Sequence, residues 1–220
     1  MYQHLDLQGQ PLPYGVGKVV CVGRSYRDHA TELNNPIPSE PLLFIKPASS
    51  LVDLAAPLVL PKGLGAIHHE VEVALLIGRR LCHADEGEAL AGIVGVGLAL
   101  DLTLRDVQDN LKAQGHPWER AKAFDGSCPI SPFVVPDCVT RLSELEFSLA
   151  VNGQFRQMGN TRDLMWPVGL LLAEMSQCFT LNPGDIVLTG TPKGVGELLT
   201  QDSLELQLDG QYRFNAVVAG

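Results

Sequence analysis

Two glutamates alternate with valine in the stretch His68-His69-Glu70-Val71-Glu72-Val73. On a β-strand, side chains two positions apart lie on the same face, about 6.6 Å from each other along the strand. Two carboxylates held side by side repel each other unless a cation lies between them or one of them carries a proton. The pattern therefore predicts either a cation site or a strand with a solvated glutamate face, and it turns His69 away from Glu70.

A third carboxylate, Asp101, follows the apolar run Ile93–Leu100. A carboxylate at the end of a buried strand needs partners, because an unpaired buried charge is costly. Asp101 could cap a helix that begins near Arg105, or it could join Glu70 and Glu72 in a set of oxygen ligands. Such a set suits Mg²⁺, Mn²⁺ or Ca²⁺, whereas structural zinc would call for cysteine or histidine at ligand spacing.

A histidine and a glutamate three positions apart, His29 and Glu32, would share one face of a helix. A histidine oriented by a carboxylate is a candidate general base, because its pKa lies near the working pH. The alternative is an exposed polar pair. The segment Asn34–Pro41, which holds three prolines, would then form a mobile lid over the site.

Two glycine-containing segments do not fit nucleotide-binding motifs. In Leu188–Gly196 the lysine follows Pro192, and the GxxxxGK[ST] spacing of a phosphate loop is absent. Gly95-Val96-Gly97 does not fit the glycine-rich motif of a dinucleotide-binding fold. In that motif a helix begins directly after the glycines, whereas here position 100 is leucine and Asp101 follows. The first segment therefore predicts a tight turn, with Thr191 as a candidate ligand donor.

The elements that must position these residues are mostly strands. Asn152-Gly153 and Asp209-Gly210 have the chemistry of two-residue hairpin turns. Apolar runs bounded by Gly, Pro, Asn or Asp predict strands at Lys18–Gly23, Leu42–Lys46, Glu70–Gly78, Ile93–Leu102, Glu146–Val151, Asp185–Thr189, Ser203–Leu208 and Arg213–Val218. Helical spacing predicts helices at Ser25–Leu33, Asp106–Gln114 and Asp163–Phe179, the last interrupted early by Pro167.

These elements predict an α+β, mostly β fold with short helices and one longer helix in the C-terminal half. The 220 residues contain 22 glycines and 15 prolines, spread throughout, which indicates many turns. No internal repeat or linker interrupts the chain. We therefore expect a single domain over residues 1–220, with residues 1–17 as an N-terminal extension.

Composition excludes several classes of protein. Acidic residues outnumber basic ones by 25 to 16, for a net charge of -9, which disfavours nucleic acid as a partner. The apolar run Ile93–Leu100 is too short to span a membrane, and the N-terminus lacks the pattern of a secretory signal. Five cysteines without a CxxC pair predict free thiols in a reducing compartment. A cytoplasmic protein is expected.

Six segments distributed over residues 18–218 carry a family resemblance. They are Val22–His29, Phe44–Pro47, His69–Glu72, Asp101–Gln108, Trp118–Asp125 and Leu188–Gly196. In this order they resemble the fumarylacetoacetate hydrolase family, and especially its small single-domain branch of acylpyruvate hydrolases and oxaloacetate decarboxylases. The resemblance implies a mixed β-roll fold and a homodimer.

The same resemblance implies roles for individual residues. It implies that Glu70, Glu72 and Asp101 bind Mg²⁺ or Mn²⁺. It implies a catalytic group of His29, Glu32 and Lys122, in which His29 is the base, Glu32 is its partner on a lid, and Lys122 lies beside the metal. It also implies that the substrate pocket is lined by Arg24, Lys46, Gln108 and Thr191.

The chemistry of the family implies cleavage of a C–C bond in a small 2-oxo acid through a metal-bound pyruvate enolate. In acylpyruvate hydrolysis, a water activated by His29 and Glu32 would attack the distal carbonyl. In oxaloacetate decarboxylation, CO₂ would leave without an attacking water. Lys122 would stabilise the developing negative charge in either reaction.

One departure from the family concerns the segment Val19–Gly23, which has no acidic residue. The large hydrolase branch takes a fourth carboxylate from this position, so a three-carboxylate site fits the smaller branch and weakens the case for fumarylacetoacetate as substrate. Two alternatives remain open. One is an isomerase or decarboxylase of hydroxymuconate-type diacids in aromatic catabolism. The other is a non-catalytic, metal-dependent 2-oxo acid binding protein, which would have no need of a base such as His29.

Overall fold

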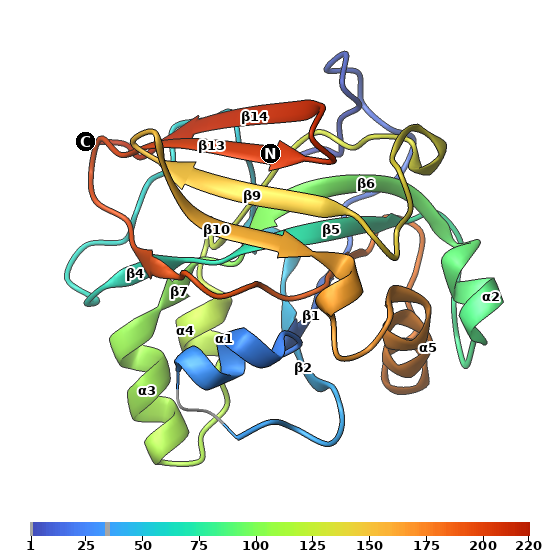
Figure 1. Ribbon diagram of the computed structural model, residues 1–220, viewed down its shortest axis with the longest axis horizontal. Coiled ribbons are helices and arrows are strands. Elements are labelled where there is room, and N and C mark those ends of the chain that lie inside the picture. The colour runs from blue at the N-terminus through green and yellow to red at the C-terminus, as the bar shows by residue number, and fades with distance from the viewer. Residues whose placement is uncertain (1, 34–35) are drawn as a thin grey trace.

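A long antiparallel pair of strands, β5 (Val71–Ile77) and β6 (Ile93–Leu100), runs through the middle of the molecule (Figure 1). Every residue of β5 is buried, so apolar side chains occupy every position of this strand except that of Glu72. The computed structural model describes residues 2–33 and 36–220. Within them, no helix is long and apolar enough to cross a membrane.

The central pair belongs to a mixed seven-stranded sheet in the order β2-β1-β11-β5-β6-β8-β3. A four-stranded antiparallel sheet follows the order β10-β9-β13-β14, and a small sheet follows the order β12-β4-β7. The remaining strands are β1 (Val19–Gly23), β2 (Leu42–Lys46), β3 (Leu51–Asp53), β4 (Ile67–His69), β7 (Thr103–Leu104), β8 (Cys128–Ile130), β9 (Glu146–Val151), β10 (Gln154–Asn160), β11 (Ile186–Leu188), β12 (Gly196–Glu197), β13 (Ser203–Leu208) and β14 (Tyr212–Val217).

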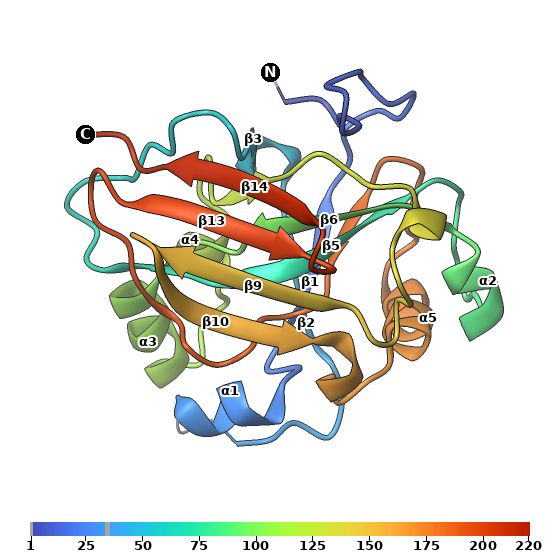
Figure 2. The same ribbon diagram turned by 45° about the horizontal axis from the view of Figure 1, so that its top comes forward.

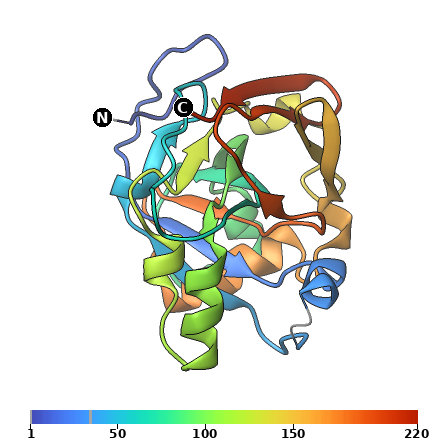
Figure 3. The ribbon, with the colours of Figure 1, turned by 90° about the vertical axis from the view of Figure 1, so that its left-hand side faces the viewer.

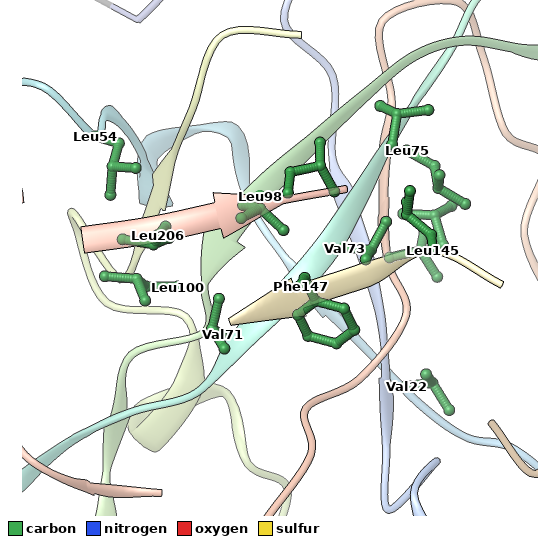
Figure 4. Close-up of a cluster of buried hydrophobic side chains, with 14 of the residues drawn as sticks. Val22, Leu54, Val71, Val73, Leu75, Leu98, Leu100, Leu145, Phe147 and Leu206 are labelled. Carbon is green, nitrogen blue, oxygen red and sulfur yellow. The ribbon is translucent and has the colours of Figure 1, made fainter. Parts of the chain in front are cut away.

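The four-stranded sheet covers one face of the central pair (Figure 2). Between the two layers lies the main hydrophobic core, where Val71 and Leu98 of the central pair meet Phe147 and Leu206 of the covering sheet (Figure 4). All four of these side chains are at most 3% exposed. The layered, mostly β architecture with a mixed sheet confirms the predicted fold class.

The helices lie at the two ends of the sheets (Figure 1), and Figure 3 shows the molecule from one of these ends. α2 and α5 pack together at one end, while α1, α3 and α4 gather near β2 at the other. The α-helices are α1 (Arg27–Glu32), α2 (Glu86–Leu90), α3 (Arg105–Ala113), α4 (Glu119–Lys122) and α5 (Val168–Cys178). Short 3-10 turns are η1 (Ala48–Ser50), η2 (Pro136–Cys138) and η3 (Thr161–Asp163).

Both predicted hairpin turns are present. Asn152 and Gly153 have φ of 52° and 74°, and Asp209 and Gly210 have φ of 53° and 68°. These left-handed values at both central positions are those of the turn that matches the twist of paired strands. The prediction of free thiols is also confirmed for the five cysteines.

Two predicted elements differ from the structure, and one helix was not predicted. The C-terminal helix begins at Val168 and not at Asp163, because Pro167 restricts the residue before it and cannot continue a helical hydrogen-bond pattern. The predicted strand Glu70–Gly78 is broken at Glu70, which separates β4 from β5. α2 was not predicted, although Asp85 and Glu88 form a capping box at its start.

The predicted lid loop Asn34–Pro41 lies partly outside the described residues, which omit 34 and 35. Residues 36–41 are irregular and contain neither helix nor strand. The helix before this loop spans Arg27–Glu32 and is therefore shorter than the predicted Ser25–Leu33.

Candidate active site

Three buried carboxylates converge where β4 passes into β5 and where β6 ends. Ligand oxygens of Glu70, Glu72 and Asp101 all lie within 4.8 Å of one another. The pairing of β5 with β6 sets Val71 opposite Leu100, and the Asp101 backbone N–H donates to the Glu70 carbonyl at 2.8 Å. Sheet pairing therefore assembles the three-carboxylate cluster that the sequence predicted as a cation site.

The cluster is not built as a plain strand face. Glu70 lies in the break between two strands, and β4 pairs with β7 and β12 whereas β5 pairs with β6 and β11. Asp101 does not cap a helix either, since the residue before α3 is Leu104 and no side chain caps that helix. The solvated-strand and helix-cap interpretations are both wrong, because all three carboxylates are buried and two of them, Glu70 and Asp101, form ion pairs.

Lys122 is the cation at the centre of the cluster. Its Nζ donates to Glu70 Oε2 at 2.7 Å and to Asp101 Oδ2 at 2.5 Å, and Arg105 forms a second ion pair with Glu70. Burial alone would raise the pKa of Glu70, but the charges of Lys122 and Arg105 outweigh it and hold that pKa well below its ordinary value. Burial also opposes the charge of Lys122, yet Asp101 and Glu70 raise its pKa.

Glu72 is the carboxylate that has no cationic partner among the residues that the structure describes. Its Oε2 accepts a hydrogen bond from the Gly190 backbone N–H at 2.6 Å. Burial raises the pKa of Glu72, and the charges of Asp101 and Glu70 add to this rise. A divalent cation would supply the missing positive charge, and an all-oxygen donor set fits Mg²⁺ or Mn²⁺.

His29 faces this cluster from α1. Its Nδ1 lies 3.4 Å from Glu32 Oε2, so the two residues share a helix face as predicted, and His29 lines the same pocket as the three carboxylates. Burial lowers the pKa of His29, although the charges of Glu70 and Glu32 partly oppose this. A lowered pKa keeps the imidazole neutral near pH 7, which is the form able to accept a proton.

The four residues expected to line the substrate pocket fall into two groups. Arg24, Gln108 and Thr191 do line it together with the carboxylates. Lys46 instead lies fully buried behind Asp101, with Nζ 2.8 Å from Asp101 Oδ1 and hydrogen-bonded to Ser127 Oγ at 3.0 Å. In this position Lys46 supports the aspartate and does not contact the pocket.

Other pocket residues were missed in the sequence analysis. Arg105, Gln108 and Lys112 recur at helical spacing along α3 and all line the pocket, with Arg105 donating to Gln108 Oε1 at 2.7 Å. This periodic polar stripe was the signal that could have revealed Arg105 and Lys112. Trp118 also lines the pocket, and it belongs to one of the six segments that carry the family resemblance.

Gln157 of β10 is a further residue that no sequence pattern indicated. Its Oε1 accepts from the Val71 backbone N–H at 3.0 Å and lies 2.9 Å from His69 Nδ1, while its Nε2 donates to Thr191 Oγ1 at 2.7 Å. Nε2 also donates to the Pro192 carbonyl at 2.9 Å. A register shift in β10 between residues 155 and 157 accompanies this inward position. One buried amide thus joins the turn after β11 to Val71, the residue between Glu70 and Glu72.

The geometry and the sequence together define the class of protein. Residues 18–219 match the family described as fumarylacetoacetate (FAA) hydrolase C-terminal. The chain belongs to this family of enzymes, as the sequence resemblance indicated.

Individual relatives narrow the comparison. The chain is 50% identical to oxaloacetate tautomerase YcgM of Escherichia coli K12 over 211 residues, which is 96% of each chain. Its fold matches a fumarylacetoacetate hydrolase family protein of Yersinia pestis, with a TM-score of 0.97, 48% identity, and coverage of 99% and 100% of the two chains.

A solved structure with bound ligands is also similar. The fumarylpyruvate hydrolase of Pseudomonas aeruginosa, in complex with Mn²⁺ and pyruvate, matches with a TM-score of 0.90 and 35% identity over 98% of this chain and 94% of that one. A 5-carboxymethyl-2-hydroxymuconate delta-isomerase of Mycobacterium smegmatis matches with a TM-score of 0.81 and 34% identity, over 94% and 80% of the chains. Members with the same fold therefore act on several related substrates.

Proposed function

We propose that this protein is a metal-dependent enzyme acting on small 2-oxo acids, and that its main reaction is keto–enol tautomerisation of oxaloacetate. The observation that carries the proposal is one pocket that holds a neutral base, His29, facing three carboxylates and Lys122. The 50% identity to an oxaloacetate tautomerase over 96% of each chain supports this choice of reaction. Tautomerisation of oxaloacetate was not predicted from the sequence, whose main prediction was cleavage of a C–C bond in a 2-oxo acid and whose enzymatic alternative was isomerisation or decarboxylation of a hydroxymuconate-type diacid.

Glu70, Glu72 and Asp101 would hold the metal ion, since their oxygens lie close enough to share one. When bound, Mg²⁺ or Mn²⁺ would act as a Lewis acid toward the 2-oxo acid. The similar fumarylpyruvate hydrolase contains Mn²⁺ and pyruvate, which supports a metal and a 2-oxo acid in this pocket.

The protein's own groups would move one proton. His29 would take a proton from C3, the carbon next to the carbonyl, and return it to the 2-oxo oxygen, so that the C3–H bond breaks and an O–H bond forms. Glu32, 3.4 Å from His29 Nδ1, would orient the ring and stabilise it while it is charged. Lys122 would donate a hydrogen bond where negative charge develops on oxygen.

A second candidate is hydrolysis of an acylpyruvate, which the similarity to a fumarylpyruvate hydrolase favours. In that reaction His29 would take its proton from a water that attacks the distal carbonyl. The hydroxymuconate alternative has support from the similar mycobacterial isomerase. A purely binding role has less support than either enzymatic alternative, because binding alone requires no base beside the carboxylates.

The test follows three readouts on the same purified protein. Ultraviolet absorbance reports loss of enol oxaloacetate, and coupled assays report pyruvate released from oxaloacetate and from acetylpyruvate, each with Mg²⁺, with Mn²⁺ and after chelation. We expect metal-dependent loss of the enol that is faster than pyruvate release. Faster release from acetylpyruvate would favour hydrolysis, and activity that survives complete chelation would refute the metal-dependent proposal.

The homodimer implied by the family resemblance remains part of this proposal. Size-exclusion chromatography with light scattering would report about twice the chain mass of 23.7 kDa for a dimer. A mass equal to one chain would refute it.

A further inference from the structure

The positive charges around the pocket are unevenly compensated. At its inner end, Lys122 and Arg105 are both paired with buried carboxylates. Arg24 and Lys112 also line the pocket, but Arg24 has no ion pair among the residues that the structure describes. Lys112 pairs only with Asp109, at 3.5 Å, and that carboxylate is 62% exposed. Such an exposed pair contributes little, so two positive charges remain largely uncompensated.

Trp118 contacts both of these cations. Arg24 Cζ lies 5.9 Å and Lys112 Nζ lies 5.7 Å from the centre of its ring, both within the range of a cation–π contact. Burial lowers the pKa of Lys112, and the charges of Arg105 and Arg24 lower it further, against the opposing effect of Asp109. The two positive charges therefore repel each other, and an anion bound in the pocket that both residues line would relieve this repulsion.

The conformation of Arg24 also indicates a ligand. Its φ of 59° lies in the left-handed region that non-glycine residues seldom adopt, and such strain concentrates at binding and catalytic sites. Its Nε is buried and has no hydrogen-bond partner among the described residues. A buried donor without a partner is costly, and a bound carboxylate would satisfy it.

We propose that Arg24 and Lys112, both against Trp118, form a second anion subsite that binds the carboxylate remote from the 2-oxo acid group. The pocket then selects 2-oxo dicarboxylic acids over monocarboxylic ones, and Lys112 is its specificity-determining residue. The inference rests on the proposed function for the placement of the 2-oxo acid at the three carboxylates.

The experiment changes Lys112, because substitution of Arg24 would also alter its strained backbone. In Lys112→Met we expect the KM for oxaloacetate to rise about tenfold, the loss expected for one charge-assisted hydrogen bond. Calorimetric titration of the Mn²⁺-loaded protein with pyruvate should give an unchanged Kd, since pyruvate has no remote carboxylate. The affinity for Mn²⁺ alone should also be unchanged. Lys112→Arg keeps the positive charge and should have a KM for oxaloacetate close to that of the wild type.

Lys62→Met is the matched control, because Lys62 is exposed and outside the pocket, and its loss changes the net charge equally. An unchanged KM for oxaloacetate in Lys112→Met, or an equal weakening of oxaloacetate and pyruvate, would overturn the subsite. Failure of the proposed function is a separate result. The wild type would then bind oxaloacetate more tightly than pyruvate, in a Lys112-dependent way, without converting it.

Discussion

Both oxygens of the Glu32 carboxylate accept a hydrogen bond from the Gly194 backbone N–H, at 3.0 and 3.1 Å, although the two residues are 162 positions apart. Glu32 ends the helix that carries the candidate base, and Gly194 lies in the turn that also carries Thr191. Asp28 and Lys193 add an exposed ion pair at 3.0 Å, which contributes little. The orientation of His29 therefore depends on the position of this turn.

Substitution of Gly194 by alanine should reduce activity without removing the metal site. Gly194 has a φ of 96°, and a Cβ there would overlap the Arg156 carbonyl oxygen, so the turn must move and carry its N–H away from Glu32. A displacement of about 1 Å can cost roughly 100-fold in rate. We expect a loss of this order in kcat and an unchanged Mn²⁺ affinity by calorimetry.

Gly153→Ala is the control for this prediction. Gly153 has a similar φ of 74° but no atom within 4 Å of an added Cβ. It should cost about 1 kcal/mol of stability and leave kcat unchanged. Equal kcat losses in the two variants would show that backbone strain, and not the Glu32 contact, is responsible.

The pH dependence of kcat/KM should report the buried state of His29. Burial lowers its pKa below the ordinary value of 6.5, against the opposing effects of Glu70 and Glu32. The neutral ring is the active base, so activity should persist as pH falls through 6.5 and decline only below the lowered pKa. In Glu32→Gln the negative charge that raises this pKa is lost, so the acid limb should shift to lower pH while the plateau falls. An acid limb above 6.5, or an upward shift in the variant, would contradict the assignment.

Glu70 and Glu72 should respond in opposite ways to neutralisation in the metal-free protein. Glu70→Gln breaks ion pairs with Lys122 and Arg105, and loss of one partner from a buried pair costs about 3–5 kcal/mol. Glu72→Gln removes a buried charge that burial and two carboxylates disfavour, so stability should stay equal or increase. Urea unfolding after chelation measures both, and destabilisation of Glu72→Gln as large as that of Glu70→Gln would disprove this account.

Mn²⁺ affinity should distinguish variants of the carboxylates from a variant of the base, His29. Glu72→Gln and Asp101→Asn should each weaken Mn²⁺ binding by more than the roughly 10–100-fold that loss of an outer-shell partner costs. His29→Ala should keep the metal and lose tautomerisation. It should lose acylpyruvate hydrolysis far more than oxaloacetate decarboxylation, because only hydrolysis requires an activated water. Calorimetry with Mn²⁺ and the three activity assays test this, and equal loss of hydrolysis and decarboxylation would refute the division of roles.

Gln157→Leu should disturb the site from the opposite sheet. The variant leaves the buried Val71 N–H without an acceptor, and such an unsatisfied group costs about 1–3 kcal/mol of stability. The Thr191 hydroxyl loses one hydrogen bond and keeps the one that it donates to the Val71 carbonyl. Because Val71 separates Glu70 from Glu72, Mn²⁺ affinity should fall as well. Gln177→Leu is the matched control, because Gln177 is exposed on α5. It should leave the stability and the Mn²⁺ affinity unchanged. A Gln157→Leu protein with normal Mn²⁺ affinity would limit this residue to a structural role.

Much of the fold could be predicted because its signals are local. Asn152-Gly153 marks a hairpin through the left-handed φ of two adjacent residues, and the run Ile93–Leu100 forms a buried strand as its composition indicates. The largest boundary error concerns the start of α5, which was predicted at Asp163 and lies at Val168. Pro167 explains it, because proline cannot continue a helical hydrogen-bond pattern, although the apolar spacing extends further back. The break at Glu70 had no such signal, because it arises from two different strand pairings.

The sequence by itself was enough to identify the three carboxylates and the His29–Glu32 pair as candidates. Glu70 and Glu72 are two positions apart, His29 and Glu32 are three apart, and the order of the motifs along the chain added Asp101. Tertiary structure alone decided which cations pair with Glu70 and Asp101, and it placed Lys46 behind Asp101 and not in the pocket. It also brought Gln157 to His69 across 88 positions of the chain. Buried charges and amides need partners to offset their lost hydration. The chain supplies those partners from distant elements, and only the packing of the sheets brings them within hydrogen-bonding distance.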